Sequence, residues 1–109
     1  MEELIKKITQ FRDERDWKQF HSPKNLATAI SIESSELNEI FLWKKEKESF
    51  EADKSRVADE IADVMIYSIL MMDTFNLDLF EIINNKISKN AIKYPISKSK
   101  GLSKKYTEL

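Results

Sequence analysis

Apolar residues recur every three or four positions along most of the chain, which is the period of an amphipathic α-helix. This pattern predicts a first helix over residues 2–16. Ser22 and Pro23 then mark a second start, because serine caps helix N-termini and proline fits the first helical turn. An apolar stripe continues from there and predicts a second helix that ends at Trp43.

The second half of the chain shows the same helical period after a polar connection. The apolar spacing predicts a third helix over residues 55–75. Asp78–Glu81 resembles a capping box, which predicts the start of a fourth helix. This helix should stop before Pro95, because the residue ahead of a proline avoids helical geometry. Residues 96–109 contain the only glycine and four lysines, and we interpret them as a tail.

These elements define an all-α protein, a four-helix bundle with a C-terminal tail. No stretch alternates apolar and polar residues cleanly, so strands are not expected. The two central helices are joined by a short polar link and should therefore be antiparallel neighbours. A length of 109 residues suits one domain spanning residues 1–109.

Composition narrows the class of protein. One glycine and two prolines argue against a turn-rich β-sandwich, and the absence of cysteine excludes disulfides and thiolate metal sites. A net charge of −1 argues against a nucleic-acid-binding protein. No segment is long and apolar enough to span a membrane, and the N-terminus lacks the cleavage site of a secretory signal. We expect a cytoplasmic protein with neither nucleic acid nor membrane as a partner.

Four carboxylates lie at or beside the apolar stripes of the two central helices. Glu33 and Glu36 are three residues apart, as are Glu60 and Asp63, so each pair lies on one side of its helix. Buried carboxylates destabilise a fold unless they are paired. Since Mg²⁺ prefers oxygen ligands, the four residues predict a site for one or two Mg²⁺ ions, with Mn²⁺ as a substitute. Charged helices also carry such pairs on solvated faces, and that interpretation stays open.

Aromatic residues form a second group of candidates. Trp17 and His21 follow the first helix, Trp43 ends the second, and Tyr67 lies one turn beyond Asp63. Flat rings of this kind can stack on nucleobases. A tryptophan at a helix end more often fills a core, so the aromatic residues have two interpretations.

Five stretches of the sequence belong to a recognisable pattern: ERDWKQFHSPKNL (14–26), ESSELNEIFLW (33–43), DEIADVMIY (59–67), KNAIKYP (89–95) and SKKYTEL (103–109). Together they resemble the MazG-like all-α nucleoside triphosphate pyrophosphohydrolases, and most closely their dCTP pyrophosphatase branch. The similarity runs across nearly the whole chain.

The resemblance implies a Mg²⁺-dependent enzyme that hydrolyses a nucleoside triphosphate, here dCTP or a modified dCTP, to the monophosphate and pyrophosphate. It implies that the catalytic metal ligands are Glu33, Glu36, Glu60 and Asp63. It implies substrate contacts at Trp17, Lys18, Gln19, Phe20, His21, Trp43, Tyr67 and Asn90. It also implies a homodimer or homotetramer with sites built where subunits meet.

Two alternatives remain beside this interpretation. The same fold could act on dUTP or phosphoribosyl-ATP, since Ile8 stands where animal members carry a histidine that touches substrate. The chain could also be a non-catalytic helical interaction module whose acids form a solvated face. Apolar residues on more than one face of the third helix, such as Ile66 and Met72, independently favour an oligomer.

Overall fold

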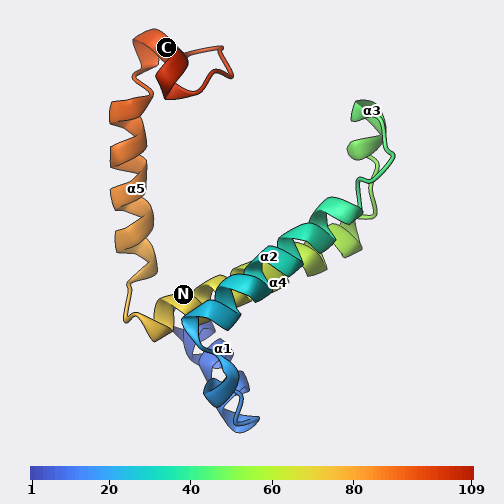
Figure 1. The fold of residues 1–109 in the computed structure, drawn as a ribbon, viewed down its shortest axis with the longest axis vertical. Helices are drawn as coiled ribbons and strands as arrows, with labels where there is room; N and C mark the ends of the chain where they lie inside the picture. Colours follow the sequence, from blue (N-terminus) through green and yellow to red (C-terminus); the bar gives the residue numbers. More distant parts are fainter. The chain divides into compact units, whose positions relative to one another are not determined.

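The computed structural model describes all residues from Met1 to Leu109 and contains helices but no strands, which confirms the all-α prediction. Four long helices and four short helical turns follow one another along the chain (Figure 1). Their bounds are α1 Glu2–Glu14, η1 Lys18–Phe20, α2 Pro23–Glu39, α3 Glu46–Ser49, α4 Lys54–Thr74, α5 Leu79–Lys93, α6 Ile96–Ser99 and η2 Tyr106–Glu108, where η denotes a 3₁₀ helix.

Side-chain caps begin the helices where the sequence predicts them. The Ser22 hydroxyl accepts a hydrogen bond from the Asn25 backbone N–H at 3.1 Å, at the start of α2. The Asp78 carboxylate accepts one from the Glu81 N–H at 2.9 Å, at the start of α5. Each cap satisfies a backbone donor that has no partner within its own helix.

The predicted end of the second helix is wrong. α2 stops at Glu39, and Trp43 lies beyond it with a left-handed φ of +66° and a 91% exposed side chain. The Phe41 and Leu42 backbone N–H groups bond to carbonyls three residues earlier, at 3.0 and 3.1 Å. This tighter turn ends the helix and begins the reversal towards α4, although the apolar spacing of the sequence continues through it.

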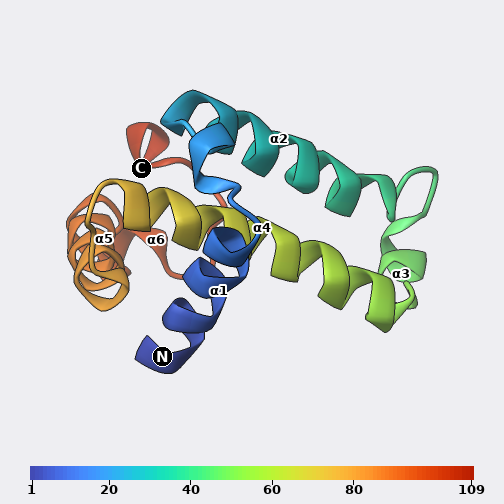
Figure 2. The same ribbon diagram turned by 90° about the horizontal axis from the view of Figure 1, so that it is seen from below.

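Residues Met1–Asn76 form one compact unit that contains α1, α2 and α4. α2 and α4 run antiparallel along each other, joined at one end by the connection that carries α3, as Figures 1 and 2 show. α1 packs on α4 near the other end of the pair. The prediction of antiparallel central helices is therefore confirmed. The buried apolar side chains of this unit are Leu26, Ile40, Ile69 and Leu70.

Residues Leu77–Leu109 form a second compact unit with α5, α6 and η2. The ring of Tyr106 meets that of Tyr94 edge-on at 6.0 Å, and the Lys93 ammonium lies 4.8 Å from the Tyr106 ring centre. Residues 96–109, predicted as a tail, therefore contain helical turns and fold back on the end of α5. That residues 1–109 act as one domain stays a prediction.

None of the helices combines the length and the apolar character that crossing a bilayer requires.

Candidate active site

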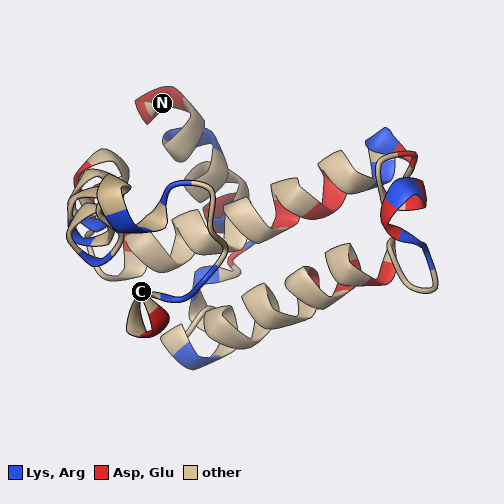
Figure 3. Cartoon of the chain, turned by 90° about the horizontal axis from the view of Figure 1, so that it is seen from above, with Lys and Arg blue, Asp and Glu red and all other residues tan.

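The two acid pairs meet where α2 and α4 pack together. Glu33, Glu36 and Glu60 can each offer one carboxylate oxygen such that these oxygens all lie within 4.8 Å of one another. Figure 3 shows acidic residues on both neighbouring helices. Asp63 lies one turn after Glu60, and its charge acts on both Glu33 and Glu60. The helical spacing of each pair and the antiparallel packing together create this cluster of like charges.

The acid cluster has no compensating charge within the chain. The three ion pairs of the structure all involve Arg12 or Arg15. Burial, followed by the proximity of Glu36, raises the pKa of Glu33 to about 7. Burial and Glu36 also raise the pKa of Glu60. One oxygen of Glu33 and one of Glu60, the Oε2 atoms, are buried without any hydrogen-bond partner.

The unpartnered oxygens of Glu33 and Glu60 bear on whether the acid cluster can bind a metal ion. Buried polar atoms without partners are rare and costly in folded proteins. Carboxylate oxygens from two helices are the ligands that Mg²⁺ takes, with the rest of its coordination left to water and phosphate. The donor set of Glu33, Glu36 and Glu60 therefore fits a hard divalent cation, and Asp63 extends it by one turn.

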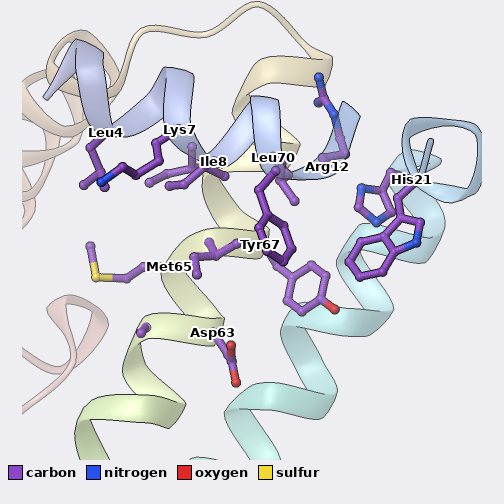
Figure 4. A pocket seen from close by; sticks show the side chains of 14 residues that line it. Leu4, Lys7, Ile8, Arg12, His21, Asp63, Met65, Tyr67 and Leu70 are labelled. Carbon is purple, nitrogen blue, oxygen red and sulfur yellow. The ribbon is translucent and has the colours of Figure 1, made fainter. Parts of the chain in front are cut away.

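A cavity of about 670 Å³ lies between α1 and α4. Four of the predicted site residues line it, namely Trp17, His21, Asp63 and Tyr67. Asp63 belongs to both the acid quartet and this cavity, so the cavity adjoins the acids. Figure 4 shows His21 beside Tyr67, with Asp63 one turn earlier on α4. The arrangement places aromatic rings next to a candidate metal centre.

His21 carries an unsatisfied polar atom towards this cavity wall. Its ring meets that of Tyr67 edge-on at a centroid distance of 6.4 Å. The Nδ1 atom of His21 is buried without a hydrogen-bond partner. Burial, and secondarily the positive charge of Arg12, lowers the pKa of His21. The lowered pKa favours the neutral imidazole, which has a nitrogen free to bind a ligand.

Most of the cavity wall was missed by the sequence analysis. These further lining residues come from α1 and α4, and they are Leu4, Lys7, Phe11, Arg12, Ala62, Met65, Ile66, Ile69 and Leu70. Ile8, which the sequence analysis linked to the choice of substrate, lines the cavity as well. The amphipathic pattern of α1 indicated that its apolar face would be covered. It gave no sign that α1 and α4 would leave a cavity between them.

The structure does not bring every predicted substrate residue to the cavity. Lys18, Gln19 and Phe20 form η1 but do not line it. The Gln19 amide instead donates hydrogen bonds to the backbone carbonyl and the carboxylate of Asp16, both at 3.0 Å. Asn90 lies on α5 in the second unit, so its contact with substrate stays a prediction.

Trp43 and Trp17 lie beyond opposite ends of α2. This helix has 17 residues, which at 1.5 Å per residue corresponds to about 25 Å. Trp17 precedes its first residue and Trp43 follows its last. One nucleobase is far too small to contact both rings within a single chain.

Comparisons with known proteins assign the chain to a family. A model of the MazG-like family matches residues 28–109, so the chain belongs to the MazG-like family. Over its full length it is 33% identical to dCTP pyrophosphatase 1 of Mus musculus, of which it covers 67%. It is likewise 33% identical, with the same coverage, to dCTP pyrophosphatase 1 of Homo sapiens. The resemblance identified in the sequence is thereby confirmed.

A solved structure supports the same assignment. The crystal structure of a pyrophosphatase from Archaeoglobus fulgidus superposes on this chain with a TM-score of 0.83 and 45% sequence identity. The match covers 87% of this chain and 92% of the archaeal one. The helical fold described here is therefore the MazG-like fold.

Proposed function

We propose that this protein is a metal-dependent nucleoside triphosphate pyrophosphohydrolase that acts on dCTP or a modified dCTP. The observation that carries the proposal is the group of three carboxylates within 4.8 Å, two of them with buried unpartnered oxygens, beside a cavity with aromatic walls. The names of the curated relatives, dCTP pyrophosphatase 1, support the choice of base.

The acid quartet is the proposed metal site. Glu33, Glu36, Glu60 and Asp63 would hold Mg²⁺, or Mn²⁺ in its place. When bound, the metal supplies charge neutralisation at the phosphate oxygens and helps to activate the attacking water. The reaction adds one water molecule to the triphosphate and gives the monophosphate and pyrophosphate. With a metal ion held by these acids, the phosphates would bind at the side of the cavity that Asp63 lines.

The cavity is the proposed nucleobase site. Trp17 and Tyr67 supply flat surfaces on which a base can stack, at about 1–3 kcal/mol per stack. His21 contributes the one buried side-chain nitrogen without a partner, so it can bond to a base edge. A site that forms such a bond rejects analogues lacking the matching group more strongly than an apolar wall does. Asn90 is a further candidate for this role, from the family resemblance.

We propose that the active form is a homodimer or homotetramer. Trp43 is 91% exposed and separated from Trp17 by the length of α2. If both tryptophans contact one nucleotide, they must come from different copies of the chain. Phe50, also 91% exposed in the same connection, adds apolar surface of the kind that marks interfaces.

A panel of nucleotides with pyrophosphate release as the readout tests the proposal. We expect hydrolysis of dCTP and 5-methyl-dCTP with Mg²⁺, much weaker hydrolysis of dUTP, and none in the presence of a chelator. Equal rates for dCTP and dUTP, or a preference for phosphoribosyl-ATP, would overturn the choice of base. No hydrolysis of any substrate, together with a melting temperature insensitive to Mg²⁺ and nucleotide, would indicate a non-catalytic module.

A further inference from the structure

Arg12 is the most deeply buried charged residue of the chain, at 4% exposure, in a unit with only four buried apolar side chains. Its guanidinium donates from Nε to the Asp13 carboxylate and from Nη1 to the Asp73 carboxylate, both at 2.8 Å. Asp13 neighbours it on α1, whereas Asp73 is 61 residues away, in the last turn of α4. The second bond therefore joins two helices at one wall of the cavity.

The backbone of Arg12 also fixes the position of Trp17, the first residue of the aromatic wall, by which we mean Trp17, His21 and Tyr67. The Arg12 carbonyl accepts hydrogen bonds from the N–H groups of Arg15 and Trp17, at 3.3 and 3.1 Å. Between them Asp16 adopts a left-handed φ of +54°, which turns the chain out of α1. Trp17 thus leaves α1 at a fixed point, bonded to the residue whose side chain reaches α4.

Further bonds carry this fixed geometry on to His21. The Phe20 N–H bonds to the Trp17 carbonyl at 2.9 Å, and the His21 N–H bonds to the Lys18 carbonyl at 3.1 Å. Trp17 also packs edge-on against Phe11 at 5.8 Å. Hydrogen bonds and the intervening backbone therefore connect the Arg12–Asp73 pair to His21. The His21 ring contacts the Tyr67 ring, and both line the cavity.

We propose that Arg12 is a positioning residue for substrate: by joining α1 to the end of α4 through Asp73, it sets the spacing between the Trp17–His21 segment and Tyr67 that a nucleobase requires. This inference rests on the proposed function, in which the cavity holds the base. Stability by itself does not explain an arginine at this position, because apolar side chains of similar volume often replace buried ion pairs without loss of stability. The planar guanidinium instead fixes direction, since it bonds two carboxylates along set axes, as a lysine cannot.

The first test measures the aromatic wall without any nucleotide. The chain contains two tryptophans, so a Trp43→Phe background leaves Trp17 as the single fluorescent reporter. We expect Arg12→Met and Asp73→Asn to shift the Trp17 emission to the red and to raise its acrylamide quenching constant, while Arg12→Lys gives an intermediate value. Lys6→Met is the matched control, because it removes an exposed positive charge from the same helix and should change neither quantity.

The second test measures the kinetic consequence in the native Trp43 background. We expect Arg12→Met to raise KM for dCTP by about tenfold, since small misplacements of positioning groups have effects of this size or larger. The kcat per folded molecule should stay within about twofold of the wild-type value, because the acid cluster is untouched. Asp73→Asn should act in the same direction, and the double variant should be no worse than Arg12→Met, as expected for one shared interaction.

The outcomes separate the two proposals. If Arg12→Met and Asp73→Asn lower the melting temperature but leave KM and Trp17 quenching at wild-type values, Arg12 is only a structural residue and the inference is wrong. If Arg12→Lys gives wild-type values in both tests, a guanidinium that bonds both carboxylates is not required, and that part of the inference is wrong. If the wild-type protein hydrolyses no nucleotide at all, the proposed function itself fails, and this result is visible before any Arg12 variant is assayed.

Discussion

In the compact unit of residues 1–76, carboxylates lie close to other charged groups at two regions along α4, and the charges around them differ in sign. At the end of α4, Asp73 bonds to the guanidinium of Arg12, and Arg12 also bonds to Asp13. In its second turn, Glu60 meets Glu33 and Glu36 with no basic partner, and buried oxygens are left unpaired. The same helix thus carries a charge network that is complete within the chain and another that is incomplete.

The difference shows where a ligand is needed. A buried charge that finds its counterion in the chain supports architecture, and removing a partner destabilises the fold. A cluster of like charges destabilises the metal-free fold, so it becomes favourable only when something from solution neutralises it. Mutations at Arg12 or Asp73 are therefore expected to lower stability as well as to displace the Trp17–His21 segment, whereas mutations in the glutamate cluster are expected to remove a binding site.

The largest expected effect is the loss of activity in Glu60→Gln. This change keeps the shape of the side chain but removes a charge and a ligand, so we expect pyrophosphate release from dCTP to fall by about a hundredfold or more. The metal-free protein should stay folded and melt at the same or a higher temperature, because repulsion is relieved. Glu51→Gln, an exposed acid in the α3 connection, is the control and should change neither. Near-normal turnover in Glu60→Gln would remove this residue from the mechanism.

The second effect is stabilisation by the metal itself. Binding to the folded state adds about 2.7 kcal/mol to the free energy of unfolding at a hundredfold excess over Kd. We expect thermal melts to show this increase with Mg²⁺ in the wild-type protein and to lose most of it in Glu60→Gln. An equal response to Mg²⁺ in both proteins would place the ion elsewhere.

A smaller effect of opposite sign is expected at the other end of the helix. Asp73→Asn weakens one charge-assisted hydrogen bond to a buried guanidinium, and we expect the free energy of unfolding to fall by about 1–2 kcal/mol. Asp73 is itself partly exposed, which limits the loss because water can replace part of the interaction. Denaturant melts of Asp73→Asn and metal-free Glu60→Gln should therefore move in opposite directions. Movement in the same direction would contradict the contrast between the two regions.

The last expected effect is a pH dependence to which the raised pKa of Glu33 contributes. The pKa of Glu33 rises from 4.5 to about 7 on folding. As the pH increases, the unfolded chain releases this proton before the folded one, so stability falls between about pH 4.5 and pH 7. Melts in a chelator should show this decrease, and Glu33→Gln should reduce it. A wild-type protein that becomes more stable over this range, with no difference from Glu33→Gln, would contradict the shift.

Local sequence signals predicted most of the helices because their causes are local. Ser22 and Asp78 bond to backbone groups three residues away, and Pro95 excludes the helix from the residue before it. The end of α2 was misjudged for the same reason. Phe41 to Trp43 continue the apolar period, and only the reversal of the chain towards α4 shows that they lie outside the helix.

The amino-acid sequence by itself determined the helical class, the caps and the two acid pairs, since the i, i+3 spacing places both acids of a pair on one side of any helix. Only the tertiary structure decided that the pairs meet, that two of their oxygens have no partner, and that Trp17 and Trp43 lie apart. It also decided that Arg12, which interrupts the apolar face of α1, is buried against Asp73. These properties depend on contacts between residues distant in sequence, and a helical period carries no information about which helices will meet or at what angle.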